Sequence, residues 1–357
     1  MANHQDKPAP GATAHSATPT QANSLRVCIL TGGGDAPGLN AVLRAFVKTG
    51  TDLGLELLGS EDGFEGLING DRLVKLKPSS VRGILPRGGS ILGCSNRANP
   101  FAYPGRDAQG KETFTDVSER VLQNIADHGI DALVMVGGDG TMTHARELEK
   151  RGVRVVGVPK TIDNDLAATD VTFGFATAVG RYAGWISLYA GIAGGADVVL
   201  LPELPYDVDR IVNKIQTRAA AGATFSLVVV GEGARPKEGQ LSTISAGAKG
   251  HLARLGGAPQ QLSSLLQGRL NHEIRVTVLG HLQRGGSPSA FDRLLGTRFG
   301  VAAANLCARG EWGQMVALRG QDVVAVPISE AVDHPKLVPL DGELVRTARA
   351  VGIELGG

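Results

Sequence analysis

Carboxylates and a hydroxyl suited to phosphoryl chemistry fall in two short stretches of this chain. Residues 161–165 read Thr-Ile-Asp-Asn-Asp, and in an extended segment Asp163 and Asp165 would point to the same side. One carboxylate could then accept the proton of an acceptor hydroxyl while the other assists a metal ion. Asp139 stands in Gly137-Gly138-Asp139-Gly140-Thr141, where it could reach a magnesium ion that bridges phosphate oxygens.

Glycine turns and cationic side chains supply the complementary donors. Gly32-Gly33-Gly34-Asp35 follows an apolar run, and free backbone amides at a helix start can hold a phosphate. Residues 280–288 add His281 and Arg284, which suit a sugar phosphate, and Arg275 lies one strand length upstream. The alternatives are structural: a tight strand-to-helix turn, a helix N-cap, an Asx turn with solvated acids, or solvated cations.

Strands and helices must position these turns. Apolar runs predict strands at residues 25–30, 131–136, 153–158, 225–230 and 274–279, each ending at one of the unusual turns. Helical spacing follows at 38–48 and from the GGDGT turn to about Arg151. Apolar strands alternating with helices predict an α/β fold with parallel-rich sheets covered by helices. Ligands bind beyond the carboxyl ends of such strands, so these four turns and Gly231-Glu232-Gly233, which follows residues 225–230, are expected to share one cleft.

Composition argues against several classes of protein. The 357 residues fit either one large α/β domain or two lobes. A formal charge of +1 gives no basic field for nucleic acid or a membrane surface. No apolar run approaches the roughly 18 residues of a membrane span. Cys28, Cys94 and Cys307 are too widely spaced for a disulfide framework, which indicates a reducing cytoplasm. Residues 1–24 carry almost no large apolar side chains and are predicted to be a disordered tail.

The motifs, in their order along the chain, resemble those of the phosphofructokinase family. They are TGGGDAPGLN (31–40), RGGSILG (87–93), GGDGT (137–141), PKTIDND (159–165), GRYAGW (180–185), AGIAGGAD (190–197) and GHLQRGGSP (280–288). GGDGT alone also occurs in NAD kinases and diacylglycerol kinases, but the combination does not. The resemblance implies a two-lobed kinase fold that transfers a phosphoryl group from ATP to the 1-hydroxyl of fructose 6-phosphate, giving fructose 1,6-bisphosphate. It also implies Mg²⁺ and a homodimer or homotetramer.

The resemblance assigns a role to each matching residue. Asp163 would be the general base, Thr161 and Asp165 would support substrate and metal, and Arg181 would stabilise the transferring phosphoryl group. Magnesium would be held by Asp139. The phosphoryl donor would be bound by Gly33, Gly34, Arg97, Gly138, Asp139, Gly140 and Thr141, and the sugar phosphate by Thr161, Asp163, Glu232, Arg275, His281 and Arg284.

The same resemblance divides the chain into lobes. Residues 25–174 and 284–334 would form the larger donor lobe, and residues 175–283 the smaller sugar-phosphate lobe. Residues 335–357 would form a C-terminal segment.

Gly140 and Lys160 bear on the choice of donor. Pyrophosphate-dependent relatives carry Asp at the position of Gly140, where its carboxylate obstructs the inner phosphate of a nucleotide. The same relatives carry Lys at the position of Lys160, yet a branch of ATP users combines this glycine with this lysine. The sequence therefore favours ATP, with pyrophosphate as the alternative.

The chain departs from the family between TIDND and GRxAG. Roughly two dozen residues are missing there, about one helix plus one strand of ordinary length, with a substrate-binding arginine among them. The full fold could be compromised, residues 173–192 could have repacked as one helix, or the chain could carry a deletion relative to a working parent. A non-catalytic sugar-phosphate or nucleotide-binding homologue is therefore the alternative function.

Overall fold

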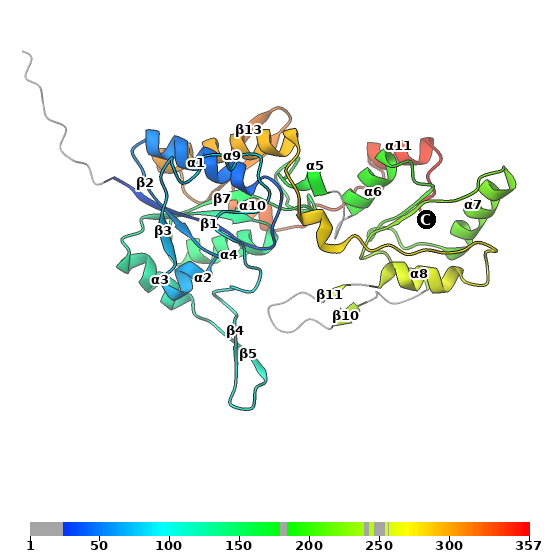
Figure 1. The fold of residues 1–357 in the computed structure, drawn as a ribbon, viewed down its shortest axis with the longest axis horizontal. Helices are drawn as coiled ribbons and strands as arrows, with labels where there is room; N and C mark the ends of the chain where they lie inside the picture. The colour runs from blue at the N-terminus through cyan, green and yellow to red at the C-terminus, as the bar shows by residue number, and fades with distance from the viewer. Residues whose placement is uncertain (1–23, 179–183, 239–242, 246–253, 256) are drawn as a thin grey trace, which may run out of the picture.

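The structure is a computed structural model that describes residues 24–178, 184–238, 243–245, 254–255 and 257–357. Figure 1 shows a larger lobe built on one sheet and a smaller lobe that contains the C-terminus. Apart from Ser24, the predicted tail lies outside the described residues.

The larger lobe is organised around a seven-stranded sheet of order β13-β12-β7-β6-β1-β2-β3. Its strands are β1 (Arg26–Thr31), β2 (Glu56–Ser60), β3 (Leu73–Lys75), β6 (Ala132–Gly137), β7 (Val155–Pro159), β12 (Gln314–Arg319) and β13 (Asp322–Pro327). Strands β2, β1, β6, β7 and β12 pair in parallel, whereas the edge strands β3 and β13 pair antiparallel. The expected α/β fold with a parallel-rich sheet is confirmed.

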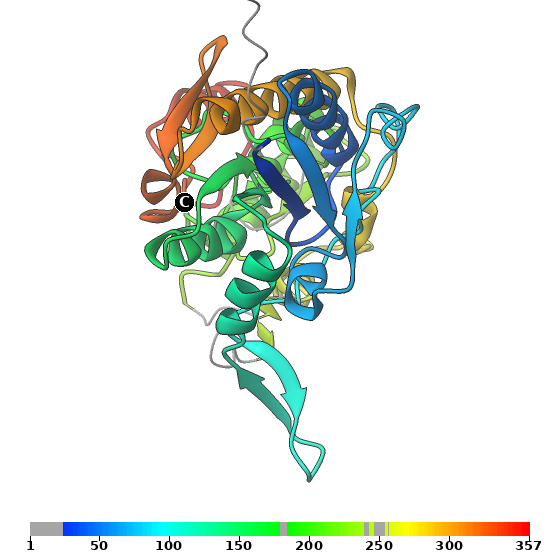
Figure 2. The ribbon, with the colours of Figure 1, turned by 90° about the vertical axis from the view of Figure 1, so that its left-hand side faces the viewer.

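Helices cover both faces of this sheet (Figure 2), so its central strands β1, β6 and β7 are almost entirely apolar and buried. One face is covered by α1 (Leu39–Asp52) and α9 (Ala290–Arg309), the other by α2 (Glu65–Asn69), α3 (Ser118–Asp127), α4 (Asp139–Lys150) and α10 (Ile328–Val332). Within β1, Val27 and Ile29 pack toward α1 and α9, whereas Cys28 and Leu30 pack toward the opposite layer. A Cβ at Gly300 would lie 2.4 Å from the carbonyl oxygen of Val42, so glycine permits the close approach of α9 to α1.

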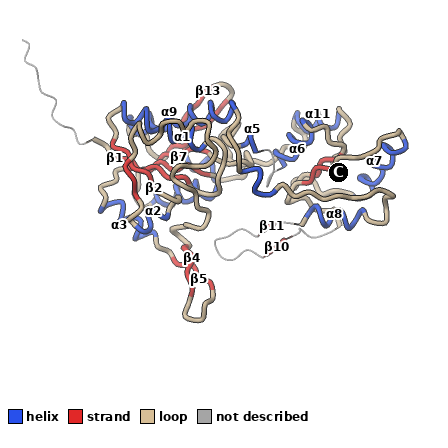
Figure 3. Tube along the Cα trace, in the orientation of Figure 1, coloured by secondary structure: helices blue, strands red, loops and turns tan. Residues whose placement is uncertain are grey.

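A hairpin of β4 (Tyr103–Arg106) and β5 (Glu112–Thr115) projects from the larger lobe, as Figures 1 and 2 show. The smaller lobe holds much less strand (Figure 3): β8 (Val198–Leu200) pairs in parallel with β9 (Val228–Val230). Its helices are α6 (Gly184–Ala193), α7 (Val208–Ala220) and α8 (Ala258–Leu266), with α11 (Glu343–Ala350) packed beside α6. The remaining short elements are α5 (Phe175–Ala178), β10 (Thr243–Ser245), β11 (Arg254–Leu255) and the 3₁₀ helix η1 (Gly280–Arg284).

The C-terminal residues share a core with the smaller lobe. Val345, Ile353 and Leu355 are buried in one cluster with Leu188 and Val199. The lobe boundaries given by the sequence remain a prediction.

The strand predicted at residues 274–279 is wrong, because this segment carries no regular secondary structure. Val278 is 63% exposed and Leu279 is 53% exposed. A strand requires a neighbour to pair with, and the described part of the smaller lobe places only β8 and β9 in a parallel ladder. The strand predicted at 225–230 shortens to β9 for the same reason. Residues 173–192 contain α5 and all of α6 except Ala193, and residues 179–183 between the two helices lie outside the described residues.

Candidate functional site

Three of the predicted turns meet at the carboxyl ends of β1, β6 and β7. The amide of Gly32 donates to the carbonyl of Val136 at 2.8 Å, and the amide of Lys160 donates to the carbonyl of Gly137 at 2.9 Å. The side chain of Thr141, in the first turn of α4, lies between the turns: a Cβ at Gly32 would lie 2.6 Å from its hydroxyl oxygen. Glycine is therefore required at position 32, where the turn at residues 32–35 approaches the turn at residues 137–141.

The acidic segment 161–165 is a turn rather than an extended strand. Asn164 has a φ of 52°, in the left-handed region, and its side chain accepts a hydrogen bond from the amide of Thr172 at 3.0 Å. Both carboxylates nevertheless approach one hydroxyl. Thr161 Oγ1 lies 3.1 Å from Asp165 Oδ1 and 3.5 Å from Asp163 Oδ2. The side chains that the sequence paired are therefore brought together by the turn and by Thr161.

The carboxylates around this turn differ in exposure. Asp163 is 7% exposed and Thr161 8% exposed. Burial raises the pKa of Asp165, while the hydrogen bond from Thr161 acts in the opposite direction. Asp139 is more accessible, but the atoms packed around its carboxyl raise its pKa, and the nearby Asp165 carboxylate adds to the effect. Two mutually repelling carboxylates at one place favour the binding of a cation between them.

These residues fit a magnesium ion only as a partial ligand set. The described residues contain no cluster of three or more His, Cys, Asp or Glu side chains that could hold a metal. Mg²⁺ usually takes one or two carboxylates and completes its shell with water and substrate phosphates. Asp139 and Asp165 match that requirement, so a metal here would depend on the phosphoryl donor for its remaining ligands.

Two cations converge on the first glycine turn. Lys160 is 3% exposed, and its Nζ donates to the carbonyl of Gly34 at 2.5 Å. Burial lowers the pKa of Lys160 to about 8, although the neighbouring Cys94, Asp35 and Asp163 oppose the shift. Arg284, from η1, donates through Nη1 to the carbonyl of Asp35 at 2.9 Å. The turn at residues 280–288 therefore contacts the turn at residues 32–35.

A loop between β3 and β4 completes this side of the site. The amide of Gly33 donates to the carbonyl of Ser95 at 3.0 Å, which fixes the backbone near Arg97, whose side chain is exposed. Asn40, 2% exposed, donates to the carbonyls of Arg87 and Gly88 at 3.2 and 3.3 Å and so holds the RGGSILG segment. This positioning role was not predicted from the sequence.

Other predicted site residues lie elsewhere or cannot be placed. Arg275 has a side chain 83% exposed and pairs with Glu273 at 2.9 Å, so it does not contact the acidic turn. Glu232 is half-buried in the turn after β9. The prediction for Arg181 lies outside the described residues, and so does the side chain of His281, although its backbone belongs to η1.

Asp292 is a second functional position that sequence reasoning missed. It is completely buried at the start of α9, and its carboxylate accepts hydrogen bonds from the amides of Gly174 and Thr177 at 2.9 and 2.8 Å. It thereby ties the chain leaving the acidic turn to the helix after the GHLQRGGSP motif. The Ser-x-x-Asp spacing of Ser289 and Asp292 is a recognisable helix-start pattern that could have indicated it.

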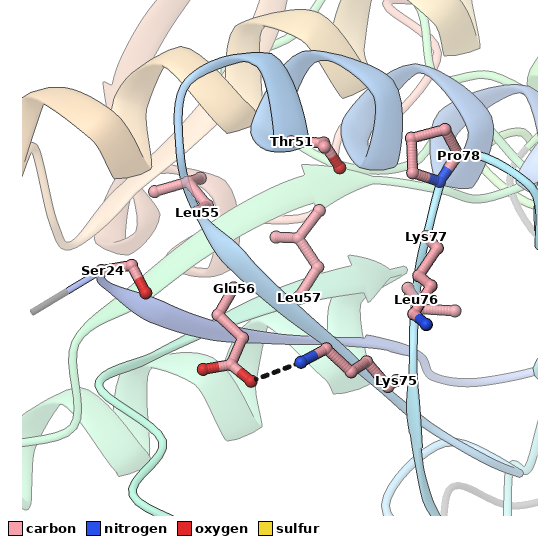
Figure 4. A pocket seen from close by; sticks show the side chains of 9 residues that line it. All are labelled: Ser24, Thr51, Leu55, Glu56, Leu57, Lys75, Leu76, Lys77 and Pro78. Carbon is pink, nitrogen blue, oxygen red and sulfur yellow. Dashed lines mark hydrogen bonds and ion pairs between the residues drawn. The ribbon is translucent and has the colours of Figure 1, made fainter.

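Two cavities lie away from these turns. One, of about 390 Å³, sits at the amino ends of β1 and β2 and is lined by Thr51, Leu57 and Pro78 among others, with Glu56 paired to Lys75 at its wall (Figure 4). Another, of about 270 Å³, lies between α7 and the C-terminal residues. Because Glu56 pairs with Arg26 at the start of β1, the first cavity is at the opposite end of the sheet from the glycine turn.

The chain is similar to known proteins over most of its length. The sequence model of the Phosphofructokinase family matches residues 26–180 and 179–307. The ATP-dependent 6-phosphofructokinase 2 of Clostridium perfringens is 48% identical over 358 residues, covering 92% of this chain and 97% of that protein. The pyrophosphate–fructose 6-phosphate 1-phosphotransferase of Streptomyces coelicolor is 44% identical, covering 88% of this chain and 96% of that protein. The solved phosphofructokinase of Pichia pastoris in the T-state superimposes with a TM-score of 0.73 at 27% identity, covering 97% of this chain and 38% of that one.

The chain belongs to the phosphofructokinase family. The two parts of the family match meet at residues 179–180, the place where the sequence predicts the missing helix and strand. None of the helices among the described residues is long and apolar enough to cross a membrane.

Proposed function

We propose that this protein transfers a phosphoryl group from ATP to the 1-hydroxyl of fructose 6-phosphate, giving fructose 1,6-bisphosphate. The observation that carries the proposal is the buried turn in which Thr161 holds Asp163 and Asp165 together beside the glycine turns. This is an acid–base group placed next to a phosphate cradle. The names of the relatives support the choice of donor and acceptor.

Asp163 is the general base in this proposal. Its carboxylate accepts the proton of the acceptor hydroxyl, while Thr161 orients it through the hydrogen bond from the Asp163 amide to the hydroxyl oxygen at 3.0 Å. The first glycine turn and the start of α4 bind the donor phosphates through their amides. Arg284 and Lys160 contribute positive charge near the transferring phosphoryl group. In the loose transition state of phosphoryl transfer, this charge stabilises the negative charge on the equatorial oxygens. From the sequence, Arg181 would add to that charge.

Magnesium is part of the proposal. Asp139 and Asp165 would hold it together with the donor's phosphate oxygens. The ion would neutralise charge that develops on those oxygens.

The donor is ATP because Gly140 leaves room for it. A Cβ at Gly140 would meet no atom within 4 Å, so nothing in the described protein fills the space beside the second glycine turn. A pyrophosphate-dependent version is the second candidate, favoured by the buried ammonium of Lys160 and by the relative of that name. The ATP-dependent and pyrophosphate-dependent candidates differ in whether the space at Gly140 accepts the inner phosphate of a nucleotide.

We also propose a homodimer or homotetramer and a cytoplasmic location. Arg275, which the sequence assigns to the sugar phosphate, extends into solvent rather than toward Asp163. An arginine in that position fits a site that is completed by a neighbouring copy of the chain.

The test is ³¹P nuclear magnetic resonance of the purified protein with fructose 6-phosphate, ATP and magnesium. A second sugar-phosphate resonance that grows with that of ADP supports the proposal, and excess chelator should stop its growth. A folded oligomer that binds fructose 6-phosphate without forming the new resonance would instead identify the non-catalytic homologue.

A further inference from the structure

Lys336, near the C-terminus, forms hydrogen bonds with the loop that follows the proposed base Asp163. The backbone amide of Lys336 donates to the carbonyl of Asp165 at 2.9 Å. Its ammonium donates to the carbonyls of Thr169 and Asp170 at 3.0 and 2.5 Å. A single side chain and its own backbone thus satisfy three carbonyls at the two ends of a six-residue loop.

The backbone just before this loop and within it is held in an unfavourable conformation. Asn164 and Ala168 have φ values of 52° and 62°, in the left-handed region that residues with a Cβ rarely adopt. Such conformations cost about 1–3 kcal/mol each and persist only when the surroundings impose them. The bonds from Lys336 flank Ala168, so they are placed to impose it.

The same residue is held from the smaller lobe. The indole Nε1 of Trp185, in the first turn of α6, donates to the carbonyl of Lys336 at 2.8 Å. The Lys336 ammonium also lies 5.3 Å from the centre of the Trp185 ring, within range of a cation–π contact. Two residues further on, the amide of Val338 donates to Glu203, which also accepts from Gly184 at the start of α6.

We propose that Lys336 is a positioning residue for phosphoryl transfer: it ties the loop 165–170, which begins two residues after Asp163, to the start of α6, and so fixes the base relative to the smaller lobe. This inference rests on the proposed function. Nothing in Lys336 touches the donor turns at residues 32–35 and 138–141 in the contacts the structure describes. Lys336→Ala would remove the bonds to Thr169 and Asp170 but keep the backbone bond to Asp165, so the side chain is expected to act on the alignment of the reacting groups more than on ATP binding.

The first experiment compares Lys336→Ala, Lys336→Arg and a matched control. The control is Lys214→Ala, because Lys214 also donates to a backbone carbonyl, that of Gly352 at 2.7 Å, but on the far side of the smaller lobe. A small misplacement of reacting groups can cost about 100-fold, so Lys336→Ala should lower kcat by roughly 10- to 100-fold. We expect the KM for ATP to stay within about twofold, partial recovery of kcat in Lys336→Arg, and ordinary kcat in Lys214→Ala.

A second readout does not depend on turnover. The chain has two tryptophans, so a Trp312→Phe background leaves Trp185 as the sole emitter. Removing the Lys336 side chain in that background should shift the emission to longer wavelength and increase quenching by acrylamide, because the ring loses its covering ammonium.

The proposal is overturned if Lys336→Ala keeps the kcat of the parent, if its KM for ATP rises as much as its kcat falls, or if Lys214→Ala shows the same loss. An unchanged Trp185 emission would also overturn it. A parent protein without turnover would instead overturn the proposed function, and the emission would still show whether Lys336 covers Trp185.

Discussion

The hydroxyl oxygen of Thr161 accepts a hydrogen bond from the amide of Asp163 at 3.0 Å and lies 3.5 Å from the carboxylate of the same residue. The hydroxyl also donates to Asp165 at 3.1 Å. One small side chain therefore sets the position of both acidic groups in the turn after β7.

Removing that hydroxyl should impair turnover more than folding. We expect Thr161→Val to lower kcat by about 10- to 100-fold, whereas Thr161→Ser keeps it within a few-fold. The hydrogen bond from Thr161 lowers the pKa of Asp165, so in Thr161→Val the acid limb of kcat/KM should move to higher pH. Steady-state rates between pH 5 and pH 8 measure both effects. An acid limb that stays in place would contradict the role given to this bond.

Gly140 offers a direct test of donor choice. Gly140→Asp places a carboxylate where donor phosphates are proposed to bind, so the KM for ATP should rise at least about tenfold. Stability should change little, because a Cβ there meets no atom within 4 Å and an acid in the first turn of a helix is favourable. Gly140→Ala is the matched control and should bind ATP nearly as the parent does. Equal KM values for ATP in all three proteins would refute the steric argument.

Lys160 should give the folded protein a distinctive pH dependence. Burial lowers its pKa to about 8, against 10.5 for an ordinary lysine. Below pH 8 the charge is present in both the folded and unfolded states, and the folded state bears the full cost of burying it. Between pH 8 and 10.5 the folded state releases the proton while the unfolded state keeps it, so that cost is relieved as pH rises.

Lys160→Met has no such group, which allows a clean comparison. Between pH 8 and 10.5, the free energy of unfolding of the parent should rise relative to that of Lys160→Met by on the order of 3 kcal/mol. Urea unfolding of both proteins at the same concentration, at several pH values across this window, measures the difference. A constant difference across the window would mean that Lys160 is not held as a buried cation.

Asp292 is predicted to be structurally essential. Asp292→Ala would leave the buried amide of Gly174 and the half-buried amide of Thr177 without their acceptor, at a cost of roughly 3 kcal/mol in the free energy of unfolding. Asp322→Ala, on the exposed edge strand β13, should cost less than about 0.5 kcal/mol. Equal unfolding midpoints in urea for the two variants would show that the bridge to α9 contributes little.

Local sequence was sufficient for β1, β6 and β7 and for the turns that follow them, but it did not predict β2, β3, β12 and β13. The run 131–136 predicted β6 because a strand buried on both faces must be apolar throughout, and GGDGT predicted the start of α4. The run 274–279 has the same apolar character yet forms no strand, since pairing depends on a neighbour that local sequence cannot supply.

Long-range hydrogen bonds were the part of the site that could not be predicted. Lys336 reaches carbonyls more than 160 residues earlier in the chain, and nothing in its neighbouring sequence marks it. At Asn164 the difference from the prediction is local: its left-handed backbone makes residues 161–165 a turn, where an extended segment was considered. Thr161 still joined the two carboxylates, because residues two and four positions along a tight turn can face the same hydroxyl.

The most direct test of the account is a coupled assay of the parent and Asp163→Asn with fructose 6-phosphate and magnesium, offering ATP and pyrophosphate separately. We expect turnover of the parent with ATP, little or none with pyrophosphate, and a loss of about 100- to 10,000-fold in Asp163→Asn while calorimetry still detects fructose 6-phosphate binding. Turnover with pyrophosphate alone would contradict the assignment of the donor, and an Asp163→Asn variant as active as the parent would contradict the assignment of the base.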